Sequence, residues 1–131
     1  MCLIVRKDAT ALIAEEDIIC YKILEKKDED EYITPYRYVA VDMGSKILEA
    51  EGEVNIESCK KVGRIEGGVI HTFAFLEEAC CEVLASECTV NIWKVFKCII
   101  PKGTKYYEGK FGPTLSYGST CIKFIEECII T

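Results

Sequence analysis

The side chains that could carry out chemistry in this chain are nine cysteines, a single histidine and a scattered set of tyrosines. His71 is the only imidazole, so a cysteine nucleophile or a mixed zinc site would have to be built around it. No Cys-x-x-Cys pair occurs, and Cys80 and Cys81 are neighbours on an expected helix, where adjacent side chains point about 100° apart. The sequence therefore predicts no metal site and no bound cofactor.

The thiols are expected to be free and mostly buried. Their number is odd, and the chain starts with the apolar stretch Met1 to Val5 ahead of any positive charge, unlike a secretory signal. Cys20, Cys98 and Cys128 lie inside hydrophobic runs, where a thiol packs as a small apolar group. Cys81 lies beside two glutamates, off the apolar stripe of its helix, and is expected to reach solvent. This cysteine usage predicts a cytoplasmic protein.

Aromatic and basic side chains form the only polar cluster that could recognise a partner. Its members are Tyr36, Arg37, Tyr106, Tyr107 and Tyr117. Tyrosine and arginine are enriched at binding surfaces, because they supply large and partly rigid contact area. The alternative is that these tyrosines pack on half-buried strands with their hydroxyl groups in water.

Composition narrows the class of partner. The chain has 131 residues, half of them apolar, which predicts a single domain over residues 1–131. No run is long and apolar enough to cross a membrane, and the net charge of −6 argues against nucleic acid and anionic lipid. Five lysines between Asn91 and Lys110 form either a small basic strip or a solvent-facing guard on a hairpin.

Hydrophobic periodicity predicts an α+β fold. Apolar, β-branched runs predict strands over residues 17–25, 69–75, 91–100 and 121–130, and a hairpin over residues 36–50. Apolar positions spaced by three and four predict one main amphipathic helix over about residues 76–87. Glycine-rich composition predicts exposed loops over residues 57–68 and 109–120. Many short strands with one helix predict a strongly bent, mostly antiparallel sheet or a half-open barrel.

Catalytic motifs are absent from the sequence. There is no Gly-x-Ser-x-Gly elbow, no phosphate-binding loop ending in Gly-Lys-Ser/Thr, and no Gly-x-Gly-x-x-Gly fingerprint. The nearest glycine-rich segment, Gly63 to Gly68, has spacing that fits neither nucleotide motif. The absence of such motifs favours a binding module over an enzyme.

Several segments together resemble a family of small uncharacterised proteins common in phages and prophage-bearing bacteria. The resemblance spans roughly residues 18–130 and is carried by four segments: Cys20-Tyr21-Lys22-Ile23-Leu24, Pro35-Tyr36-Arg37-Tyr38, Gly68 to Ala79, and Cys98 to Thr104 followed by Tyr106-Tyr107-Glu108-Gly109. No activity comes with this family, so the resemblance implies only a small phage-type or prophage-type protein.

The chain is also similar, at the level of fold, to ADP-ribosyltransferase-type domains. These domains place a Tyr-Arg early, a strand and helix in the middle, and an acidic residue late. The likeness implies that Arg37 would hold dinucleotide phosphates, Ser119 or Thr120 would support the site, and Glu126 would be the catalytic acid. With His71, these residues are the candidates for a catalytic cleft.

The function expected from the sequence is a small cytosolic binding or interaction module. Its surface is expected to be formed by the segments 57–68 and 109–120, and its partner to be a protein or a small molecule. A nucleotide-binding or ADP-ribosyltransferase-like enzyme is the first alternative. A structural homo-oligomer is the second, because apolar strands can leave an exposed sheet edge.

Overall fold

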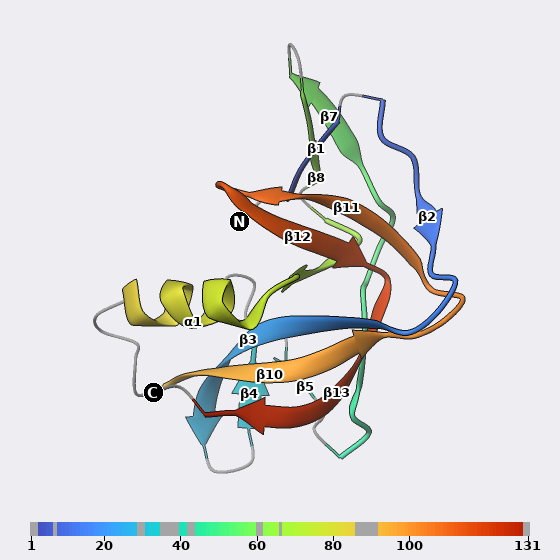
Figure 1. The fold of residues 1–131 in the computed structure, drawn as a ribbon. Coiled ribbons are helices and arrows are strands. Elements are labelled where there is room, and N and C mark those ends of the chain that lie inside the picture. The colour runs from blue at the N-terminus through green and yellow to red at the C-terminus, as the bar shows by residue number, and fades with distance from the viewer. Residues whose placement is uncertain are drawn as a thin grey trace.

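The computed structural model describes residues 3–6, 8–28, 31–34, 40–41, 44–59, 62–65, 67–85 and 92–129. In these ranges the chain forms thirteen strands and one helix (Figure 1). The elements are β1 (Leu3–Arg6), β2 (Leu12–Ile13), β3 (Ile18–Asp28), β4 (Glu31–Ile33), β5 (Ala40–Val41), β6 (Ile47–Glu49), β7 (Ile56–Cys59), β8 (Val62–Ile65), β9 (Ile70–Phe73), α1 (Leu76–Ala85), β10 (Trp93–Ile100), β11 (Lys105–Phe111), β12 (Thr114–Ser119) and β13 (Cys121–Cys128).

The strands form one mainly antiparallel sheet in the order β6-β13-β10-β3-β9-β12-β11-β1-β8-β7. β2 pairs with β11, β4 pairs with β3 and β5, and the helix is the single helical element of the described residues. The sheet is neither closed nor strongly curled, so the expectation of a strongly bent sheet or half-open barrel is wrong in this respect. The two end strands, β6 and β7, are joined covalently through residues 50–55 and are not paired with each other.

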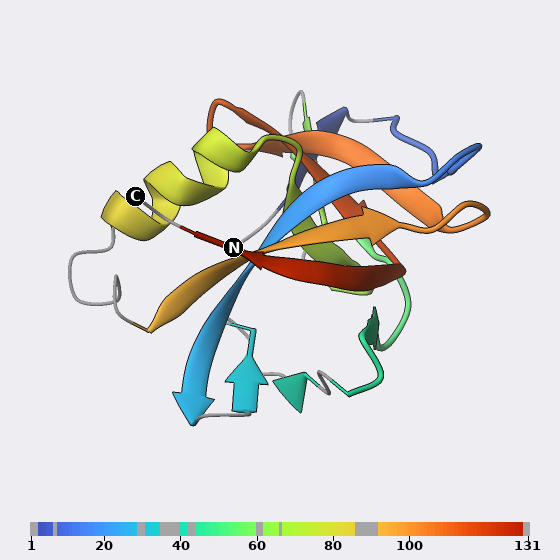
Figure 2. The same cartoon turned by 60° about the horizontal axis from the view of Figure 1, so that its bottom comes forward.

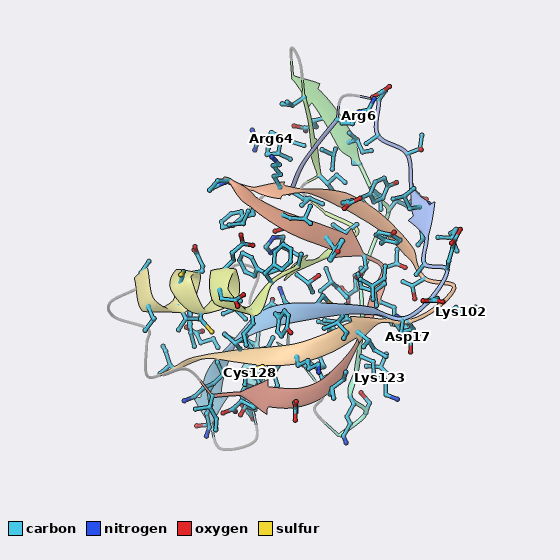
Figure 3. All side chains as sticks on the ribbon, in the orientation of Figure 1. Arg6, Asp17, Arg64, Lys102, Lys123 and Cys128 are labelled. Carbon is cyan, nitrogen blue, oxygen red and sulfur yellow. The ribbon has the colours of Figure 1, made fainter. Side chains whose placement is uncertain are left out.

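The centre of the sheet confirms the strands predicted from apolar runs. β3 and β10 are antiparallel along the whole of β10, from Trp93 opposite Glu25 to Ile100 opposite Ile18. Figure 2 shows β3, β10 and β13 side by side. At one end of this group, Asp17 Oδ1 accepts a hydrogen bond from the backbone N–H of Lys102 at 2.9 Å, which ties the turn after β10 to the start of β3 (Figure 3).

The helix begins where predicted and packs on the sheet through β3, β9 and β10 (Figure 1). Ala79 and Val83 are fully buried, while Leu84, at the edge of the predicted stripe, is 51% exposed. Glu77 and Glu78 lie in the first turn, where their charge complements the helix dipole. Residues 86 and 87 of the predicted helix lie outside the described residues. No helix in the described part of the chain has the length and apolar character of a membrane span.

Both predicted loops contain hairpins. The segment 57–68 contains most of the β7–β8 pair, and the segment 109–120 contains the end of β11 and all of β12. The prediction was wrong because glycine was taken as a sign of a loop. Gly109 instead lies within β11 at a point that β1 approaches closely, since a Cβ atom there would lie 2.4 Å from the carbonyl oxygen of Ile4.

Residues 36–39, 42 and 43 of the hairpin predicted over residues 36–50 lie outside the described residues, and the two described strands of that segment, β5 and β6, do not pair with each other. β5 pairs with β4, with Tyr32 opposite Val41. β6 pairs with β13, with Leu48 opposite Ile122. Both Leu48 and Ile122 are buried, so burial against the long last strand takes precedence over the local turn signal.

The central strands of the sheet have two differently covered faces. We call the face under α1 the helix face; it carries Ile23, Phe73 and Val95, packed against Ala79 and Val83. We call the opposite face the inner face; it carries a second buried cluster with Cys20, Leu24, Phe96, Cys98 and Phe124 among its members. A third cluster, comprising Leu3, Val5, Ile65 and Tyr107, lies between β1, β8 and β11.

The close approach of β1 to β11 at Gly109 yields a test of the fold. Gly109→Ala should lower the free energy of unfolding by about 1–3 kcal/mol, because the new methyl group meets backbone rather than a movable side chain. Gly112→Ala is the matched control: nothing lies within 4 Å of its Cβ position, and only its positive φ of 60° opposes the change. Urea unfolding of both variants measures the difference, and a cost at Gly109 no larger than that at Gly112 would contradict the close crossing.

Candidate functional site

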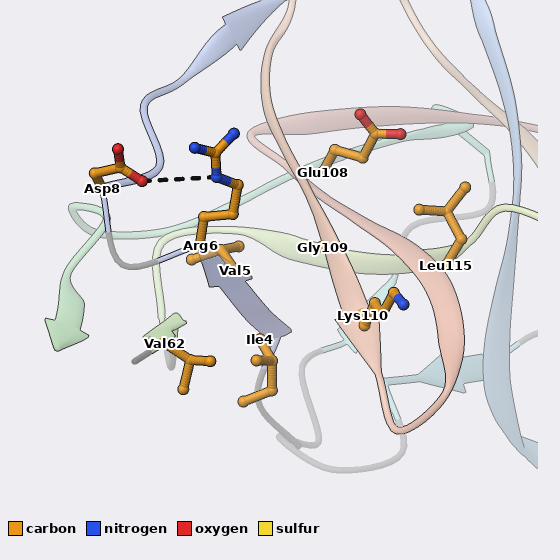
Figure 4. A pocket seen from close by; sticks show the side chains of 9 residues that line it. All are labelled: Ile4, Val5, Arg6, Asp8, Val62, Glu108, Gly109, Lys110 and Leu115. Carbon is orange, nitrogen blue, oxygen red and sulfur yellow. Dashed lines mark ion pairs between the residues drawn. The ribbon is translucent and has the colours of Figure 1, made fainter. Parts of the chain in front are cut away.

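A pocket of about 490 Å³ opens between β1, β8 and the β11–β12 hairpin (Figure 4). Its volume lies within the range of small-molecule sites. The residues that line it combine apolar and charged side chains, and they are Ile4, Val5, Arg6, Asp8, Val62, Glu108, Gly109, Lys110 and Leu115. The pocket can therefore hold an apolar body and still meet charged groups of a ligand.

The pocket brings together the two segments predicted to form the binding surface. Val62 comes from the segment 57–68, and Lys110 and Leu115 come from the segment 109–120. β1 joins them, because Ile4 lies opposite Arg64 of β8 on one side and opposite Lys110 of β11 on the other. The segments are hairpins rather than loops, but they meet at one site.

Charges of both signs line the mouth of the pocket. Arg6 and Asp8 form an ion pair at 3.7 Å, with both side chains about four-fifths exposed or more, so this pair stabilises the fold little. Glu108 and Lys110 come from β11 on the other side (Figure 4). Because the side chains of Arg6 and Asp8 are exposed to solvent, either can exchange its ion-pair partner for a charged group of a ligand at a low cost in free energy. No pattern in the sequence indicated Arg6 or Asp8, which reach the pocket only because β1 is inserted between two later hairpins.

The tyrosines predicted to bind a partner divide between different environments. Tyr106 and Tyr117 meet edge to face, with ring centroids 6.0 Å apart, and both pack against the inner-face cluster. Burial raises the pKa of Tyr117, and the nearby carboxylate of Glu108 adds to this shift. Tyr107 is 7% exposed and belongs to the third cluster, so it offers a partner little surface. Tyr36 and Arg37 lie outside the described residues.

The described members of the predicted catalytic set lie apart. His71 packs on the helix face against Phe73 and Phe111, with ring centroids 4.9 and 5.3 Å away. Ser119 is fully buried, and since it lies opposite Ile70 of the inner-face cluster, it belongs to that face. Glu126 is exposed on β13 opposite Lys97, with β10 and β3 between it and His71.

His71 is held neutral by its surroundings. Burial is the main cause that lowers its pKa to about 3, and the positive charge of Lys22 is the next. Its Nε2 atom is buried and has no hydrogen-bond partner among the described residues. A neutral, enclosed imidazole acts here as an aromatic packing group, and it would accept a proton only at strongly acidic pH.

Cysteines contribute packing rather than reactivity at the centre of the sheet. Cys20 and Cys98 lie opposite each other on β3 and β10 with no exposed surface. Burial raises the pKa of Cys20 to about 11 and raises that of Cys98 further. All six cysteines whose side chains are described are unpaired, and Cys81 is exposed as expected. Among all residues that the structure describes, no group of three or more His, Cys, Asp or Glu side chains could hold a metal ion.

The polar residue that the sequence analysis overlooked is Lys22. It stands between Cys20 and Leu24 on β3, so strand alternation places it on the inner face, opposite Phe96 of β10. Burial lowers its pKa to about 8. The signal was present in the sequence, since Lys22 is the single charge within the apolar run from Ile18 to Leu24.

Comparison of the chain with protein-family models, curated proteins and solved structures finds no match.

The partly buried Lys22 side chain predicts an unusual pH dependence of stability. Its folded pKa of about 8 lies below the unfolded value of 10.5, so between these values the unfolded chain binds more protons and folding becomes more favourable as pH rises. Lys22→Met should raise the free energy of unfolding at pH 7 by about 1–3 kcal/mol, because it removes the cost of burying a charge. The gain should shrink toward zero near pH 10.5. Denaturant melts from pH 7 to 10.5 measure this, and a destabilised Lys22→Met variant would refute the assignment.

Proposed function

We propose that this chain is a small, non-enzymatic binding module of the phage or prophage type that holds its ligand in the pocket between β1, β8 and the β11–β12 hairpin. The observation that carries the proposal is that two segments distant in sequence meet around a cavity of about 490 Å³. The six unpaired thiols among the described side chains agree with a reducing compartment such as the cytoplasm.

The lining of the pocket defines the kind of ligand. Ile4, Val62 and Leu115 offer apolar walls, and charged groups of both signs flank them. A ligand that fits this lining has an apolar body with at least one charged group, as a small amphiphilic molecule or the side chains of a peptide do. Binding rather than catalysis is favoured, because the described members of the predicted catalytic set lie on different strands and faces.

Blocking the pocket tests the proposal. Val62 is 38% exposed at the pocket wall, so Val62→Arg should fill the mouth without disturbing a core position. Ile13→Arg is the matched control, because Ile13 is 59% exposed on β2 and does not line the pocket. Fragments found by ligand-observed NMR with the unmodified chain should lose affinity at least tenfold for Val62→Arg and keep it for Ile13→Arg. If no fragment distinguishes the two variants, the pocket is not the binding site.

A homo-oligomer is the second candidate, favoured by a row of isoleucines on the helix face. Ile19, Ile99 and Ile47 lie in register across β3, β10 and β6, with Lys123 of β13 between the last two. Ile19 and Ile47 are 51% and 47% exposed. Lys123 lies on this face because it is opposite Ile99, and Glu126 lies on it because it is opposite Lys97 and, beyond that, Tyr21. A two-fold axis could set Lys123 of one copy against Glu126 of a second, so the face is self-complementary.

Ile19→Lys should weaken such an association, because a charge would be buried at the centre of the apolar row. Leu12→Lys is the control, since Leu12 is 43% exposed on β2, away from the row. Light scattering across a concentration series should give a larger mass for the unmodified chain and for Leu12→Lys than for Ile19→Lys. A monomeric unmodified chain at high micromolar concentration would eliminate this candidate.

A further inference from the structure

Two opposite charges that line the pocket, those of Glu108 and Lys110, have no ion-pair partner among the described residues. The ion pair found at the pocket joins Arg6 to Asp8 instead. Glu108 and Lys110 are both exposed and lie two positions apart on β11 (Figure 4). Strand alternation therefore places them on the same side of the sheet, with their Cβ atoms about 7 Å apart. A ligand in the pocket meets one negative and one positive group at this separation.

Apolar side chains flank these two charges on the same side of the sheet. Ile4 of β1 and Leu115 of β12 both lie opposite Lys110, one on each side of β11, and both are half-buried. Val62 of β8 lies opposite Arg6 and completes the apolar wall. An apolar group that covers these side chains is removed from water, which stabilises a complex in proportion to the area buried.

The strand pairing along β11 is interrupted beside Glu108. Among the described residues, β1 pairs with β11 only through Ile4, and β2 pairs with it again from Leu12. Between these two points the chain turns away, because the carbonyl oxygen of Arg6 accepts a hydrogen bond from the backbone N–H of Ala9 at 3.0 Å. No residue of the described strands lies opposite Glu108 on this edge. A peptide ligand can pair with a sheet at such an opening through its own N–H and C=O groups.

We infer that the ligand of this pocket is a zwitterionic dipeptide with apolar side chains, an inference that rests on the function proposed above. The terminal ammonium and carboxylate groups of an extended dipeptide lie about 7 Å apart, which matches the spacing of Glu108 and Lys110. The ammonium group pairs with Glu108 and the carboxylate with Lys110. The apolar side chains contact Ile4, Val62 and Leu115. The four charged residues that line the pocket sum to zero, so a ligand of zero net charge leaves no charge unbalanced.

Leucyl-leucine is the test ligand, and each of three analogues lacks one of its features. N-acetyl-leucyl-leucine lacks the ammonium group, leucyl-leucine amide lacks the carboxylate, and glycyl-glycine lacks the apolar side chains. In NMR titrations leucyl-leucine should bind most tightly. Each singly charged analogue should bind about two- to fivefold more weakly, as expected for ion pairs open to solvent. Glycyl-glycine should bind about tenfold more weakly or worse, because it loses the apolar contact area.

Variants of the two charged residues should remove these preferences one at a time. Glu108→Gln should bind leucyl-leucine and N-acetyl-leucyl-leucine equally, and Lys110→Gln should bind leucyl-leucine and its amide equally. Lys105→Gln is the matched control, because Lys105 is an exposed lysine on the same strand and is not among the residues that line the pocket. This control should keep both preferences. All three variants should fold, because each replaces an exposed side chain.

The outcomes separate this inference from the proposed function. Equal affinity for leucyl-leucine and its singly charged analogues, or preferences that persist in Glu108→Gln and Lys110→Gln, would overturn the dipeptide assignment. Binding of leucyl-leucine that Val62→Arg leaves unchanged would overturn it as well. If fragments lose affinity in Val62→Arg but leucyl-leucine does not bind, the inference falls and the pocket remains the binding site.

Discussion

The antiparallel pairing of β3 with β10 is the constraint from which the remaining architecture follows. Both strands are apolar on both faces, so each needs a cover on two sides. The helix α1 covers one end of the helix face, and the buried cluster of the inner face covers the opposite side of the two strands. The remaining edge of β10 accepts β13, and that of β3 accepts β9 and β4. Because Cys20 and Cys98 meet at the centre of this pair without exposed surface, small side chains permit close packing there.

Sequence patterns predicted the elements whose signals are local. The runs at β3, β10 and β13 are long and β-branched, and the apolar spacing of α1 is helical, so each was found close to its true position. The β7–β8 and β11–β12 hairpins were missed, because Gly63, Gly109 and Gly118 indicate loops when only neighbours in sequence are considered. In the fold these glycines leave room for side chains or backbone of other strands. Such close approaches are tertiary contacts between residues distant in sequence, and a local sequence pattern does not indicate them.

The candidate sites were predictable to different extents. The segments 57–68 and 109–120 were singled out from the sequence, and both contribute residues to the pocket. The contribution of Arg6 and Asp8 could not be predicted, because it depends on which strands flank β1, and pairing between distant strands produces no periodic pattern in the sequence. Lys22 was visible as a charge within an apolar run. Its depressed pKa was not, because that shift depends on how completely neighbouring strands exclude water from the amine.

The position of β1 also bears on how the molecule is assembled. β1 is synthesised before both of its partners, which are β8, at residues 62–65, and β11, near residue 110. Its full set of backbone hydrogen bonds cannot form until the residues of β11 have left the ribosome. Until then Leu3 and Val5 have nothing to pack against and remain open to contact with chaperones or other nascent chains. β1 therefore completes its pairing only after both of these later strands have been synthesised.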